Sequence, residues 1–181
     1  MRKALASALF AAVAAFAFGP VYAQTTEGGS TEVKAQSACV NEWLFNGMWR
    51  VRVTDVAWAP PDATHSDPAW LVTEQWGNGT TFPNLNTNMT GLRQMYLVFP
   101  NGDTMVEPGE EAGSGKLNGH NFPPSGQFTY QQMFTSRTLD QKTKPAKLLV
   151  IFDPQGKPPS GKWWTQKTPA YNYRIDLTCN K

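Results

Sequence analysis

The segment 43–56 alternates apolar and polar residues in a way that indicates one kind of secondary structure. From Trp49 to Thr54, tryptophan or valine occupies every second position, and arginine or threonine occupies the positions between them. This period of two is typical of a β-strand with one buried face and one solvated face. The Asn46-Gly47 pair just before it favours a turn, because glycine tolerates a positive φ. A strand with one apolar face needs partner strands, so the rest of the chain must supply a sheet.

The remainder of the chain contains further short segments with strand character. They are residues 70–76, 92–99, 104–106, 127–134, 146–152 and 171–179. No segment keeps the 3.6-residue period of an amphipathic helix. Residues 107–126 are rich in glycine and proline, and we expect a long loop there. Short strands with turn-rich connections predict an all-β protein, an antiparallel two-sheet immunoglobulin-like sandwich of about seven strands.

The chain begins like an exported protein. Two basic residues, Arg2 and Lys3, precede an alanine-rich apolar run, and small residues surround Ala23. This order predicts a signal peptide over residues 1–23, with an uncleaved amphipathic anchor as the alternative. Residues 24–38 are polar and are expected to form a flexible leader, and residues 39–181 to form the β-sandwich domain. The predicted location is therefore secreted or periplasmic.

The two cysteines lie at opposite ends of the predicted domain. Cys39 opens it, and Cys179 stands on the side of the last strand that also carries Tyr173 and Ile175. In an oxidising compartment we expect a Cys39–Cys179 disulfide, buried and structural. Two buried free thiols are the alternative, and a metal site is disfavoured because no histidines accompany the cysteines.

The charge of the chain argues against a nucleic-acid partner. The formal net charge is +2, and both excess charges belong to the predicted signal peptide. Without that segment the charge is zero, whereas a phosphate-binding face needs clustered positive charge. No later apolar run is long enough to span a bilayer.

A series of motifs resembles a known family. In order they are WRVRVTDV, WLVTEQWGNGT, LVFPNGDTM, FPPSGQFTYQQMF and KLLVIFD. Over about residues 45–153 the chain is similar to bacterial extracellular immunoglobulin-like domains of unknown function. The resemblance implies a sandwich outside the cytoplasm but no activity. The pair Trp163-Trp164 and the glycine-rich loop depart from the family pattern.

Few residues suggest catalysis or metal binding. The two histidines, His65 and His120, lie in polar loops without the spacing of a metal site, although His65 has Asp62 and Asp67 nearby. Solvated loop residues are the simpler interpretation. We therefore predict no catalytic residues, no metal and no cofactor.

Glu74 is the exception among the carboxylates. It falls between Val72 and Trp76 on the predicted core side of its strand, so we expect it to pair with Arg50 or Arg52, or to lie near an exposed edge.

The tryptophans provide the main indication of function. Trp163 and Trp164 are consecutive, so in a strand their side chains point to opposite faces and one is exposed. Exposed rings stack on sugars or anchor protein partners, which makes both residues candidate ligand contacts. The alternative is that both rings fill the core.

These observations favour an exported, soluble β-sandwich that acts as a binding or structural module and not as an enzyme. Its contact surface would be aromatic loops or an edge strand, and its partner a protein or polysaccharide at the cell surface, with homo-oligomers possible. The first alternative is a subunit of an extracellular filament or surface layer. The second is a small carbohydrate-active enzyme with Glu74 or Glu110 as its acid.

Overall fold

The computed structural model describes residues 35–63, 65–83, 85, 92–106, 111–112, 117, 119–152 and 172–180. The predicted signal peptide, most of the leader, and the residues Glu110, Trp163 and Trp164 lie outside these ranges. The described residues contain no helix, and so none that could cross a membrane.

The described ranges contain ten strands. They are β1 (Ala35–Val40), β2 (Leu44–Phe45), β3 (Trp49–Ala59), β4 (Ala69–Asn78), β5 (Leu92–Val98), β6 (Thr104–Val106), β7 (Glu111–Ala112), β8 (Gln127–Thr135), β9 (Lys147–Phe152) and β10 (Asn172–Asn180). The seven predicted strands correspond to β3, β4, β5, β6, β8, β9 and β10. The short strands β2 and β7, and the six-residue β1, have no counterpart in the prediction.

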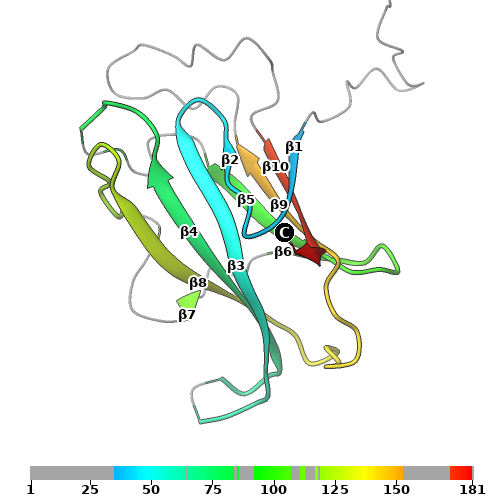
Figure 1. Cartoon of the computed structure of the whole chain (residues 1–181). Helices are drawn as coiled ribbons and strands as arrows, with labels where there is room; N and C mark the ends of the chain where they lie inside the picture. Colours follow the sequence, from blue (N-terminus) through cyan, green and yellow to red (C-terminus); the bar gives the residue numbers. More distant parts are fainter. Residues whose placement is uncertain are drawn as a thin grey trace, which may run out of the picture. The chain divides into compact units, whose positions relative to one another are not determined.

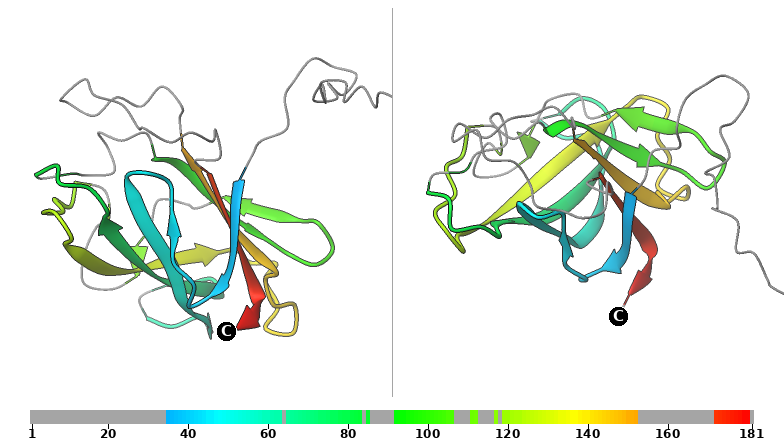
Figure 2. Two further views of the ribbon diagram at one scale, coloured as in Figure 1. Left: turned by 45° about the horizontal axis from the view of Figure 1, so that its top comes forward. Right: turned by 90° about the horizontal axis from the view of Figure 1, so that it is seen from above.

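The strands form two five-stranded sheets that lie as separate layers (Figures 1 and 2). One has the order β1-β10-β9-β5-β6, and the other has the order β2-β3-β4-β8-β7. The prediction of an all-β, two-sheet sandwich is confirmed. The expected antiparallel pairing holds for every pair except β1 and β10, which run parallel.

The first strand begins before the predicted start of the domain. Ala35 pairs with Asn172, and the parallel register continues to Cys39 opposite Asp176. Strand β1 therefore begins four residues before Cys39. The segment AQSACV has little strand propensity of its own, and the distant strand β10 makes it a strand.

The core lies between the two sheets and is rich in aromatic rings. Trp49, Trp76, Phe152 and Tyr173 are all inaccessible or nearly so. Trp76 of one sheet lies 6.2 Å from Phe152 of the other between ring centroids. The Tyr173 hydroxyl donates a hydrogen bond to the Trp49 carbonyl oxygen across the sandwich (2.6 Å).

The predicted alternation of β3 is confirmed. Trp49, Val51 and Val53 are fully buried, while Arg50 is exposed. A bulge between Val53 and Asp55 then shifts the register by one residue. After it Asp55 pairs with Thr73, on the outer face.

The glycine-rich segment 107–126, for which we expected a long loop, contributes described residues to the core. Phe122 is fully buried and its ring lies 5.0 Å from that of Trp49, edge to face. Backbone hydrogen bonds pair Phe122 with Leu85, which is also buried. Glycine and proline content indicated an irregular backbone but did not indicate which side chains it buries.

The predicted disulfide between Cys39 and Cys179 is present, with a Cα–Cα distance of 5.2 Å. It joins β1 to β10 at the ends of the described domain. Both cysteines are only half-buried, so the bridge lies at the edge of the core and not within it as expected. The alternation of β10 does hold for Tyr173 and Ile175, which are fully buried.

Burial raises the pKa of Tyr173 well above 10.0, which makes the stability of the fold sensitive to alkaline pH. The unfolded chain ionises near the ordinary pKa, whereas the folded chain retains the neutral hydroxyl. The stabilisation is therefore complete below pH 10.0 and is lost as the pH rises toward the folded-state pKa.

We expect Tyr173→Phe to flatten the fall in unfolding free energy between about pH 9 and about pH 11, at a cost of about 1 kcal/mol at neutral pH. Urea unfolding at several pH values measures both quantities. Tyr96→Phe, which removes a half-buried hydroxyl that donates to Gln94 (2.6 Å), is the control for loss of a tyrosine hydroxyl. An unchanged alkaline profile in Tyr173→Phe would contradict the assignment.

Candidate functional site

The outer face of the β2-β3-β4-β8 sheet carries the most distinctive set of exposed side chains. The register brings Phe45 opposite Arg50, and it aligns Arg52, Gln75 and Thr129 across three strands. We call this surface the aromatic–arginine face, made up of Trp43, Phe45, Arg50, Arg52, Gln75 and Thr129.

Two aromatic rings on this face are exposed. Trp43 is 37% accessible and Phe45 is 41% accessible, whereas Leu44 between them is buried. Trp43 directly precedes the edge strand β2 and Phe45 ends it, so the two exposed rings flank the buried Leu44. Phe45 lies directly against Gly79, where a Cβ atom would come within 2.3 Å of the ring. Only glycine leaves room for the ring in this position.

Each ring has a guanidinium group over it. The Arg52 guanidinium carbon lies 4.7 Å from the centroid of Trp43, and that of Arg50 lies 5.6 Å from the centroid of Phe45. Both distances are in the range of cation–π contacts. The two ring–guanidinium pairs therefore stand one after the other along β2 and β3.

A polar ladder holds Arg52 in place. Its Nε donates to Gln75 Oε1 (2.8 Å), and Gln75 Nε2 donates to Thr129 Oγ1 (3.4 Å). Cross-strand side-chain bonds of this kind restrict the rotamers of long side chains. The ladder fixes the orientation of the guanidinium plane over Trp43.

The described part of the chain supplies no ion-pair partner for the two arginines of this face. Among the described residues, ion pairs join His65 to Asp62 and Arg137 to Asp67, and neither Arg50 nor Arg52 takes part in one. Among the described residues beside this face, Asp55 is an exposed carboxylate.

Glu74 does not pair with Arg50 or Arg52, the two arginines that the sequence suggested as its partners. It is fully buried, and its Oε2 accepts a hydrogen bond from Trp76 Nε1 (2.6 Å). The alternation of side chains along β4 correctly predicted that Glu74 faces the core. The alternation along β3 places Arg50 and Arg52 on the outer face of the same sheet, where they cannot reach Glu74. Its carboxyl group therefore lies within the sandwich and away from both surfaces.

The histidines are placed by local contacts. His65 Nδ1 lies 3.0 Å from the Asp67 carbonyl oxygen, and its Nε2 lies 3.4 Å from Asp62 Oδ2. The His120 ring stacks on Phe128 with centroids 4.0 Å apart. Within the described ranges no three His, Cys, Asp or Glu side chains gather as metal ligands would.

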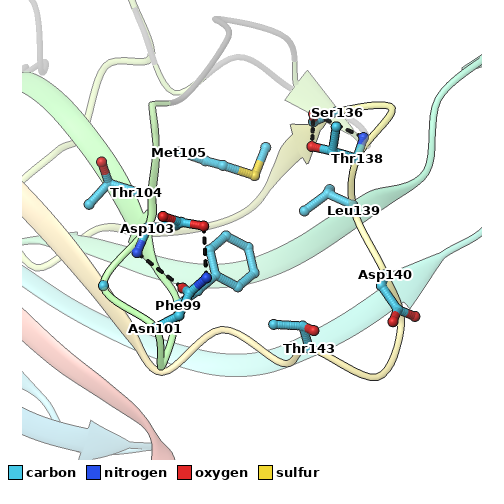
Figure 3. A pocket seen from close by; sticks show the side chains of 11 residues that line it. Phe99, Asn101, Asp103, Thr104, Met105, Ser136, Thr138, Leu139, Asp140 and Thr143 are labelled. Atoms are coloured by element: carbon cyan, nitrogen blue, oxygen red, sulfur yellow. Dashed lines mark hydrogen bonds between the residues drawn. The ribbon is translucent and has the colours of Figure 1, made fainter.

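A groove of about 680 Å³ lies between the β5–β6 turn and the loop that follows β8 (Figure 3). Phe99, Met105 and Leu139 supply its apolar part. At its rim Asn101 Nδ2 donates to Asp103 Oδ2 (2.7 Å). These rim groups already bond each other, so the groove offers fewer open donors than the aromatic–arginine face.

The predicted contacts Trp163 and Trp164 lie outside the described residues. The tryptophan that is exposed in the described part, Trp43, was not among the predicted site residues. The alternation of β3 already indicated that Arg50 and Arg52 point outward. No pattern showed that an edge strand brings Trp43 and Phe45 beside them, because that contact depends on pairing between β2 and β3.

Comparisons with known proteins identify no family. No family model and no curated protein matches the chain. An uncharacterised beta-sandwich protein from Clostridium difficile is similar in structure, with a TM-score of 0.49 and 10% identity over 82% of this chain and 97% of that chain. The yjhA protein from Bacillus subtilis has a TM-score of 0.41 and 10% identity, over 77% of this chain and 98% of that chain. At these values neither likeness bears on function.

Proposed function

We propose that this chain is an exported, immunoglobulin-like binding module that holds a polysaccharide on its aromatic–arginine face. The observation that carries the proposal is the pair of exposed rings, Trp43 and Phe45, each with a guanidinium group over it. The signal-like first residues and the Cys39–Cys179 disulfide support a location outside the cytoplasm.

The chemistry of this face suits a sugar polymer. Aromatic rings contact the C–H faces of sugars, and arginine, glutamine and threonine donate or accept hydrogen bonds at hydroxyl groups. The polar ladder from Arg52 through Gln75 to Thr129 continues from the rings across the sheet. A β-sheet surface is open at both ends, so an extended chain can lie on it without its ends being enclosed.

The test is calorimetric titration of the mature protein with a panel of plant and bacterial polysaccharides. We expect Trp43→Ala to weaken binding by about tenfold or more, since truncating a central aromatic contact typically costs over 1 kcal/mol. Gly79→Ala, which displaces the Phe45 ring, is expected to weaken binding as well. Val106→Ala removes a comparably exposed apolar side chain from the other sheet and is the matched control.

Trp163→Ala and Trp164→Ala belong in the same titration, because both remain candidate contacts from the sequence. Loss of binding in these two variants, with Trp43→Ala unchanged, would move the site away from the aromatic–arginine face. Concentration-dependent polymerisation in light scattering would favour the filament subunit, and release of reducing sugar would favour the enzyme.

A further inference from the structure

We infer that the polysaccharide held on the aromatic–arginine face is acidic, with carboxylates on successive sugars that bind Arg50 and Arg52. This inference rests on the proposed function and adds the chemical class of the ligand. It follows from what the two guanidinium groups contact, what they leave open, and how they are spaced.

The guanidinium groups are oriented but largely unoccupied. Each group carries five N–H donors in its plane. A cation–π contact with a ring is not a hydrogen bond to an oxygen, so it leaves N–H donors available for a ligand. Among the described residues, Arg52 donates only its Nε–H, to Gln75, and Arg50 makes no side-chain hydrogen bond. Open forks of this type match the two oxygens of a carboxylate.

The charges favour an anion over a neutral sugar. Within the described ranges neither Arg50, which is exposed, nor Arg52, which is half-buried, forms an ion pair, and the neighbouring Asp55 supplies one negative charge against their two positive ones. Hydrogen bonds between guanidinium and carboxylate are about twice as strong as neutral ones. A neutral ligand with only hydroxyl groups could not form these stronger hydrogen bonds with the two guanidinium groups.

The repeat along the strands favours a polymer over a single acidic group. Arg50 and Arg52 are two residues apart on one face of β3, which separates their Cα atoms by about 7 Å. Phe45 and Trp43, which are also two residues apart in the sequence, lie against Arg50 and Arg52. A polysaccharide chain that lies along β3 therefore contacts two ring–guanidinium pairs in succession. Each pair can bind one uronic acid.

The experiment compares two probes with one backbone, polygalacturonate and its fully methyl-esterified form. We expect the mature protein to bind the acid at least about tenfold more tightly than the ester. Its affinity for the acid should fall as NaCl rises from about 0.05 M to about 0.5 M, because salt screens exposed charges.

Substitution of the arginines separates the two proposals. Arg50→Gln and Arg52→Gln are each expected to remove most of the preference for the acid over the ester, while weaker binding to the ester persists. Arg174→Gln, an exposed arginine on β10 of the other sheet, is the matched control. Thermal unfolding of every variant shows that the fold is retained.

Two results would overturn the inference. Equal binding of acid and ester, unaffected by either arginine substitution but weakened by Trp43→Ala, would leave a neutral-polysaccharide module. Binding to anionic phospholipid vesicles without binding to either polymer would assign the arginines to phosphate groups on a membrane. If the wild-type protein binds none of the polysaccharides tested, the proposed function itself fails.

Discussion

Replacing both Cys39 and Cys179 with serine is expected to lower the free energy of unfolding by about 5 kcal/mol. The bond closes a loop with a sequence separation of 140 residues, so its loss releases nearly the whole domain in the unfolded state. On the chain-entropy model the stabilisation grows with the logarithm of loop length. A loss of this size is comparable to the total stability of many domains.

The disulfide has a second, local effect that the same variant reveals. It joins β1 to β10, and in the described sheet the edge strand β1 pairs with β10 alone. Amide hydrogen exchange should therefore increase most in Ala35–Val40, because this edge strand loses its covalent link. Unfolding by guanidinium chloride of the oxidised protein, the reduced protein and the double serine variant measures the free energy of unfolding of the whole domain.

The reduced wild type is the control for the serine side chains themselves. Both forms lack the bond, so their midpoints should agree. A destabilisation below about 1 kcal/mol would contradict the prediction and would mean that the unfolded chain already holds its ends together.

Trp76→Ala is expected to destabilise the fold by about 3–5 kcal/mol, the usual range for removing a large aromatic side chain from a core. Trp76 is fully buried and contacts both sheets. Its ring centroid lies 5.8 Å from that of Trp49 in its own sheet and 6.2 Å from that of Phe152 in the opposite sheet. No single neighbouring side chain can fill the space that it leaves.

Trp76→Phe separates packing from hydrogen bonding at this position. Phenylalanine retains much of the ring but removes the Nε1–H that donates to Glu74 Oε2. Loss of a donor to a buried acidic group costs about 1–3 kcal/mol. Combining it with Glu74→Gln in a double-mutant cycle measures the coupling between the two side chains.

Trp58→Phe is the matched control, since Trp58 is only half-buried and also forms an edge-to-face pair, with Trp70. We expect a smaller loss there. A coupling energy near zero for Trp76 and Glu74 would contradict the assigned hydrogen bond, even if both single variants were destabilised.

The regular strands were predictable because their signal is local. In β3 and β10 the alternation of side chains identifies the buried face before any partner strand is known. The same alternation correctly predicted that Glu74 lies on the core side of β4. The disulfide was predictable for a different reason, since two cysteines have one internal pairing and the predicted signal peptide favours an oxidising compartment.

The sequence by itself determined the class of fold, the buried faces of the long strands and the pairing of Cys39 with Cys179. Only the tertiary structure decided that β1 is a strand, that Glu74 bonds to Trp76, and that Phe122 enters the core. It alone brought Trp43 and Phe45 beside Arg52 and Arg50. The physical reason is that alternation reports the side of a strand on which a residue lies. Contacts with other segments depend on which strands pair and in which register, and those choices are made by residues far apart in the chain.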